Sequence, residues 1–130
     1  MERQSKNEKL LQYFKDICLI PRQTGDEEAI SQYLLDFAKA RGLQAERDAH
    51  HNVLIRKPST IPGYNGPTVI VQGHMDIVYE KSADSTHKYG DGIHVAEEDG
   101  YLKSADGTSL GADNGLAVAY AMDLLDRNDL

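Results

Sequence analysis

The chain has 130 residues, of which 40% are hydrophobic and 27% charged, and this composition is typical of one globular domain. Its 21 acidic residues outnumber 14 basic ones for a net charge of -7, which disfavours a nucleic acid or an anionic membrane as the partner. No secretory signal pattern follows Met1, and no stretch approaches the roughly 18 apolar residues of a membrane-spanning helix. We therefore expect a cytoplasmic protein.

Two amphipathic helices are predicted in the first third of the chain. Apolar residues recur at helical spacing over residues 10–18, and Pro21 ends that pattern. A second apolar stripe covers residues 30–38, and Thr24 and Glu27 precede it at the spacing of a capping box. The single cysteine, Cys18, lies in the first stripe, so we expect a buried structural thiol.

Short strands are expected next. Residues 43–47 alternate in polarity and residues 53–55 are apolar, with a polar turn between them, which predicts a hairpin. A surface loop rich in proline and glycine covers residues 58–67. Thr68 to Val71 form a continuous β-branched run, the pattern of a strand that is covered on both faces.

The rest of the chain predicts one more hairpin and one more helix. Residues 93–98 and 101–104 flank Asp99-Gly100, a strong hairpin signal. Residues 116–125 are apolar on most positions, which indicates a largely buried helix. Helices mixed with a central apolar strand predict an α/β fold, in which helices pack on a mixed, largely parallel sheet.

The first candidate for chemistry is Gly73-His74-Met75-Asp76, directly after the predicted buried strand. Open α/β sheets place their ligand sites at such strand ends. A neutral imidazole is a good zinc ligand, and a nearby carboxylate can accept its other N–H and so fix its orientation. Alternatively, His74 is an ordinary strand-end histidine and Asp76 a loop or capping residue, because a lone H-x-D triplet is common.

The second candidate is the glycine-rich turn at residues 107–115, which contains Asp113 and leads into the last predicted helix. Taken alone, Asp113 is explained as a helix cap, since aspartate and asparagine are preferred there. Together with His74 and Asp76, however, it supplies an imidazole and carboxylate donor set that zinc accepts. We expect the other four histidines to be solvated: His50, His51, His87 and His94.

At these residues the sequence resembles the M20 metallopeptidases, and within them the aminoacyl-histidine or cytosolic non-specific dipeptidases. The segments VIVQGHMDIV and DGTSLGADNGLAVAYAM carry the resemblance, which extends over nearly the whole chain. It implies that His74 ligates one zinc ion, that Asp113 bridges two ions, and that the catalytic Asp76 orients His74. It also implies a cis peptide between Asp113 and Asn114. The substrates implied are short peptides, and manganese or cobalt can replace zinc.

The family's adjacent glutamate pair, which supplies the general base and a ligand, falls some distance after the Ala-Asp-Asn motif, in a region that these 130 residues do not contain. The resemblance therefore implies that residues 1–130 are the N-terminal portion of a zinc-peptidase catalytic domain, inactive by itself and missing later strands and a lid or dimerisation domain. A homodimer is one expected state of the whole protein. Two alternatives stay open: an aminopeptidase or tripeptidase of the same clan, and a non-catalytic relative that associates with a partner through exposed sheet edges.

Overall fold

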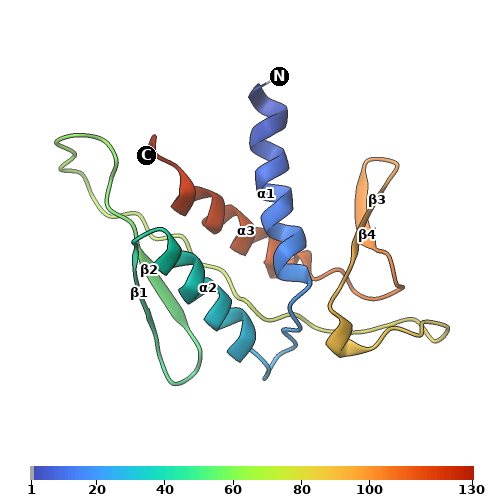
Figure 1. Cartoon of the computed structure of the whole chain (residues 1–130). Coiled ribbons are helices and arrows are strands. Elements are labelled where there is room, and N and C mark those ends of the chain that lie inside the picture. Colours follow the sequence, from blue (N-terminus) through green and yellow to red (C-terminus); the bar gives the residue numbers. More distant parts are fainter. Residues whose placement is uncertain (1) are drawn as a thin grey trace.

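The computed structural model describes residues 2–130, with side chains described from residue 7 onward. Within this part of the chain, three α-helices, four short strands and one 3-10 turn alternate with long irregular segments (Figure 1). In chain order the elements are α1 (Glu2–Cys18), α2 (Glu28–Ala40), β1 (Gln44–Arg47), β2 (Val53–Arg56), η1 (Tyr89–Asp91), β3 (Val95–Glu98), β4 (Tyr101–Ser104) and α3 (Ala112–Asp126).

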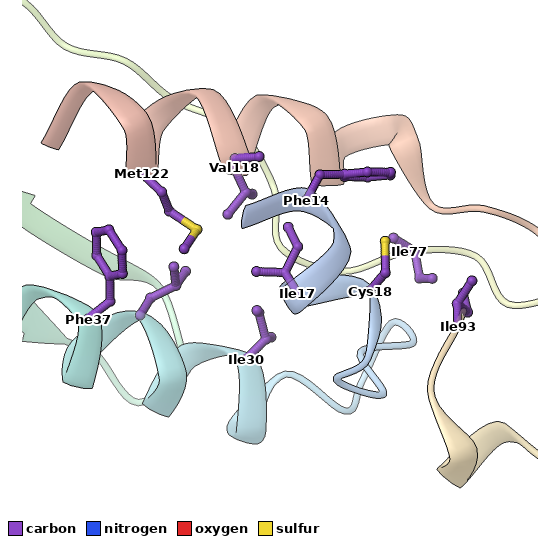
Figure 2. Close-up of a cluster of buried hydrophobic side chains, with 11 residues drawn as sticks. Phe14, Ile17, Cys18, Ile30, Phe37, Ile77, Ile93, Val118 and Met122 are labelled. Carbon is purple, nitrogen blue, oxygen red and sulfur yellow. The ribbon is translucent and has the colours of Figure 1, made fainter. Parts of the chain in front are cut away.

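The apolar core lies where the three helices meet, as Figure 2 shows. The predicted stripes of the first two helices face it, and Cys18 is buried there as expected. Burying one such large apolar side chain contributes about 1.5–3 kcal/mol. None of the described helices is long and apolar enough to cross a membrane. The buried apolar residues that form the core cluster are Phe14, Ile17, Cys18, Ile30, Leu34, Phe37, Ile77, Ile93, Val118, Ala119 and Met122.

Both predicted hairpins are confirmed. Strands β1 and β2 pair antiparallel, and β3 pairs antiparallel with β4 in a separate two-stranded sheet. Asp99 and Gly100, which connect β3 and β4, both have positive φ angles, of 52° and 79°. Two-residue turns with this conformation match the twist of antiparallel strands, so the Asp-Gly pair specifies the hairpin.

The predicted largely parallel sheet is wrong for the described residues. Thr68 to Val71 belong to no strand, and Ile70 is 84% exposed, although their β-branched side chains predicted a strand covered on both faces. The physical reason is that residues 2–130 place no strand on either side of this segment. The isolated parallel bridge between Gln23 and Ile77 lies further along the chain. The fold is α/β, with small antiparallel sheets.

Two segments bring the candidate residues together. The loop between α1 and α2 runs beside residues 75–77, because Ile77 N donates to Arg22 O at 3.0 Å and Thr24 N donates to Ile77 O at 3.2 Å. At the start of α3, Asp113 and Asn114 have non-helical backbone angles, and the peptide bond between them is cis, as the resemblance implied.

Candidate metal site

His74 has a defined ring orientation although its side chain is half exposed. Its Nδ1 atom lies 2.9 Å from the backbone oxygen of Asp76 and 3.3 Å from Oδ1 of the same residue. A carbonyl oxygen only accepts hydrogen bonds, so Nδ1 carries the proton and Nε2 of the neutral ring has the free lone pair. The backbone N–H of His74 donates to Oδ1 of Asn114 at 3.2 Å, which ties this residue to the start of α3.

Nε2 of His74 faces the carboxylate of Asp113, with 3.1 Å between Nε2 and Oδ1. The side chain of Asp113 is 91% exposed, and no side-chain capping bond forms at the start of α3. A capping role for Asp113 therefore has no support in its contacts. A lone pair on Nε2 and an ionised carboxylate repel each other unless a proton or a metal ion lies between them. A positive charge between Nε2 of His74 and the carboxylate of Asp113 would therefore stabilise this pair.

The pKa shifts of His74 and Asp76 fit that arrangement. The hydrogen bond to the Asp76 carbonyl raises the pKa of His74, and the contact with Asp113 adds to the rise. The hydrogen bond from Thr24 lowers the pKa of Asp76, and the charge of His74 acts in the same direction. A second proton on Nε2, which the raised pKa favours, would lie between Nε2 and Asp113, where a metal ion would also lie.

Two residues that the sequence did not assign to the site also contact it. Thr24 Oγ1 donates to Oδ2 of Asp76 at 2.6 Å, so it does not act as the predicted helix cap, and α2 begins at Glu28 without a side-chain cap. Arg22, in the same loop, donates to the backbone oxygens of Met75 and Gly111. Thr24 did carry a signal, but the capping pattern offered a local role for a residue whose partner is 52 positions away.

Two other polar groups have structural contacts. The spacing G-x-S-x-G of a nucleophilic serine occurs around Ser109, but Ser109 Oγ donates to Val78 O at 2.8 Å and accepts from Glu80 N, with no histidine among its partners. The expectation that His87 is solvated is wrong. Its ring is 7% exposed and lies between Tyr79 Oη, 2.7 Å from Nδ1, and Gly92 O, 2.5 Å from Nε2.

The donor set is suited to zinc but incomplete. Imidazole nitrogen and carboxylate oxygen are ordinary zinc ligands, and a zinc site takes about four ligands in all. Among residues 2–130, no group of three or more histidine, cysteine, aspartate or glutamate side chains is placed to hold a metal. The described residues therefore supply one facing pair, His74 and Asp113. A surface hollow lined by residues that include His94 and Asp106 does not contain this pair.

The chain is similar to two known dipeptidases. The chain is 39% identical over 112 residues to the cytosol non-specific dipeptidase of Escherichia coli (strain K12), a match covering 86% of the chain and 23% of the relative. The crystal structure of aminoacylhistidine dipeptidase from Vibrio alginolyticus superposes with a TM-score of 0.88 at 35% identity, covering 94% of the chain and 25% of that protein. The chain is thus similar to dipeptidases of this type over most of its own length.

The M20 dipeptidase resemblance inferred from the sequence is thereby confirmed, for a part of these proteins. The chain spans about a quarter of the length of the two dipeptidases it matches. No family model matches the chain.

Proposed function

We propose that residues 1–130 form the N-terminal portion of the catalytic domain of a metal-dependent dipeptidase, and that the longer protein hydrolyses Xaa-His or other dipeptides. One observation carries the proposal. In a chain 39% identical to a dipeptidase, the unprotonated nitrogen expected of His74 faces the carboxylate of Asp113 across 3.1 Å. Such a pair at the surface of a small domain, with no capping role for the aspartate, is best explained by a shared cation.

His74 would hold one zinc ion through Nε2, and Asp113 would bridge it to a second ion, for which manganese or cobalt can substitute. When bound, the metal would supply an activated water and stabilise the oxyanion that develops on the peptide carbonyl. Asp76 keeps the proton of His74 on Nδ1, through its backbone oxygen at 2.9 Å and its carboxylate at 3.3 Å. That contact fixes the ring and increases the basicity of Nε2.

The remaining parts of such a site would lie outside this chain. A dipeptidase of this type needs a glutamate as general base, which moves the proton between water and the leaving amine. No glutamate appears among the contacts of His74, Asp76 and Asp113 in the described part of the chain. We therefore infer that the 130-residue chain is inactive alone and binds zinc weakly.

The same comparison supports a cellular location for the proposed enzyme. One relative is called a cytosol dipeptidase, which supports a cytoplasmic location. Short peptides would be the substrates, and the exposed segment at residues 68–71 is available to contact further strands of the longer protein or a second subunit.

The test is hydrolysis of β-alanyl-histidine and of an α-dipeptide by the longer protein, after removal of metal and after its restoration. Activity should disappear without metal and return with zinc or manganese. His74→Ala should lower kcat by about 100-fold or more, the scale of losing a group that stabilises the transition state. His94→Ala, which removes a histidine paired with Asp106 Oδ2 at 3.2 Å, is the matched control and should leave activity unchanged. Equal activity of the two variants would contradict the proposal.

A further inference from the structure

Arg22 is a buried cation that forms no direct ion pair in the described structure, although the charge of Asp76 acts on it from a distance. Its side chain is 1% exposed, and none of the ion pairs found among residues 2–130 includes it. Its Nη1 donates to Met75 O at 2.9 Å and its Nη2 to Gly111 O at 3.2 Å, whereas Nε has no hydrogen-bond partner. Cys18 Sγ lies 3.9 Å from Nη2. The guanidinium thus binds two backbone oxygens from segments that are distant in the sequence.

Both of these oxygens lie in the chain segments that carry the candidate metal ligands. Met75 lies between His74 and Asp76, and Gly111 lies two residues before Asp113. The guanidinium is planar and presents its N–H groups in a fixed geometry. When it binds one oxygen at each end, it therefore holds the two oxygens at a fixed distance from each other. No other described side chain donates to the backbone oxygens of both segments.

The start of α3 approaches the guanidinium closely enough to require glycine. A Cβ atom at Gly115 would lie 2.6 Å from Arg22 Nη2 and 3.2 Å from Phe14, and one at Gly111 would lie 3.1 Å from the same nitrogen. Contacts below 3.0 Å do not occur for real Cβ atoms, so a side chain at Gly115 would displace Arg22. The helix and the arginine therefore fit each other closely.

An arginine is a costly way to fill this space. Burial lowers the pKa of Arg22, since the charged form loses its hydration there. An unbranched apolar side chain of similar length would fill the same volume without this desolvation cost. Packing alone does not explain the charge, whereas bridging two carbonyl oxygens does.

We propose that Arg22 is a positioning residue, which sets the distance between His74 and Asp113 by joining the Met75 and Gly111 carbonyls. The inference rests on the proposed function, because the separation matters only if the two side chains share a metal ion. Arg22 itself touches neither the metal nor the substrate. Its loss should weaken metal binding even in a protein that keeps its fold.

The experiment is a titration of this chain with zinc alone, followed by NMR at the imidazole resonances of His74 and His94. His94 pairs with Asp106 in a similar way but lies away from Arg22, so it reports zinc binding that Arg22 does not influence. In Arg22→Met, the dissociation constant at His74 should rise about 10- to 100-fold, the usual range for removing a residue that orients ligands. The constant at His94 should not change. Arg22→Lys, which can reach one carbonyl but cannot fork between two, should give an intermediate value.

Circular dichroism and thermal unfolding of the metal-free variants show whether the fold is kept. If Arg22→Met does not fold, Gly115→Ala serves instead, because its added methyl group displaces the guanidinium while alanine favours a helix, and the same loss at His74 is expected. A folded variant that binds zinc at His74 within about twofold of the wild type would overturn the inference. Absence of zinc binding at His74 in the wild-type chain would contradict the shared metal ion itself, and with it this inference, whereas loss of dipeptidase activity is tested separately on the longer protein.

Discussion

Thr24 Oγ1 donates a hydrogen bond of 2.6 Å to Oδ2 of Asp76, across the junction between the α1–α2 loop and the segment that carries His74. This bond is the largest of the influences that lower the pKa of Asp76. It leaves Oδ1 of Asp76 on the side of His74, at 3.3 Å from Nδ1. The loop between the first two helices therefore takes part in arranging the candidate site.

Thr24→Val should raise the pKa of Asp76, because it removes the hydroxyl and keeps the shape of the side chain. A carboxylate whose folded pKa is lowered stabilises the protein above its unfolded pKa, and this contribution is lost as pH falls through the folded pKa. The variant should be less stable by about 1 kcal/mol at pH 7, the net worth of one hydrogen bond, and closer to the wild type in acid. Carboxyl NMR titration and urea unfolding measure the two effects. Thr24→Ser should behave as the wild type, and an unchanged pKa in Thr24→Val would contradict the assignment.

The apo protein should bind its proton on His74 more tightly than a free imidazole does. The pKa of His74 is raised, mainly by the Asp76 carbonyl, so its contribution to stability is present below the unfolded pKa and is lost as pH rises through the folded pKa. Asp113→Asn should lower this pKa, because it removes the facing negative charge. Histidine NMR titration without metal checks this, and a pKa that does not move in Asp113→Asn would show that the 3.1 Å contact is not formed in solution.

Asp126 should stabilise the packing of α3 against the first two helices. Although burial opposes it, hydrogen bonds from Arg41 Nε at 2.6 Å, Lys9 and Tyr13 hold the pKa of Asp126 far below its usual range. Asp126→Asn should cost about 1–2 kcal/mol at pH 7, after allowance for partial exposure. The cost should vanish as pH falls through the folded pKa, since the wild-type carboxylate is then also neutral. Denaturant unfolding at pH 7 and at pH 2 should show a smaller cost at pH 2, which lies between the unfolded and folded pKa values; Asp123→Asn is a control on the same helix.

The exposed apolar segment should cause self-association of the isolated chain. Val69 and Ile70 are 78% and 84% exposed, and unpaired extended segments of this kind pair with other chains. Ile70→Lys should reduce association in sedimentation experiments and change the free energy of unfolding by less than about 0.5 kcal/mol. Ile17→Ala, which truncates a fully buried side chain, should instead cost about 2–5 kcal/mol. A monomeric wild type at high concentration would contradict the prediction.

The sequence predicted those parts of the fold whose signals are local. The helical stripes and the Asp99-Gly100 turn need only nearby residues, and the structure contains all three helices and both hairpins. The strand at Thr68–Val71 failed because pairing needs neighbouring strands, which residues 2–130 do not supply. Its β-branched composition predicts two covered faces, and the described residues cover neither of them.

In the candidate site, too, local signals were readable from the sequence and contacts with distant partners were not. His74, Asp76 and Asp113 could be named as candidates because imidazole and carboxylate groups are ordinary zinc ligands and stand here after a predicted strand or in a glycine-rich turn. The structure brings the three residues together, and their role stays a prediction. Arg22 and Thr24 were missed because their partners lie more than 50 residues away and their sequence context resembles an ordinary helix connection. His87 was missed because residues 80–92 are polar and lack periodicity, which gave no sign of burial.

The central claim, that His74 and Asp113 share a metal ion, is tested most directly by the position of zinc in crystals of this chain soaked with zinc, located by anomalous diffraction. The account predicts a peak between Nε2 of His74 and a carboxylate oxygen of Asp113, at about 2.0–2.2 Å from each, with the side chains moved apart from their present 3.1 Å contact. A peak only at His94 and Asp106, or none near His74, would contradict it.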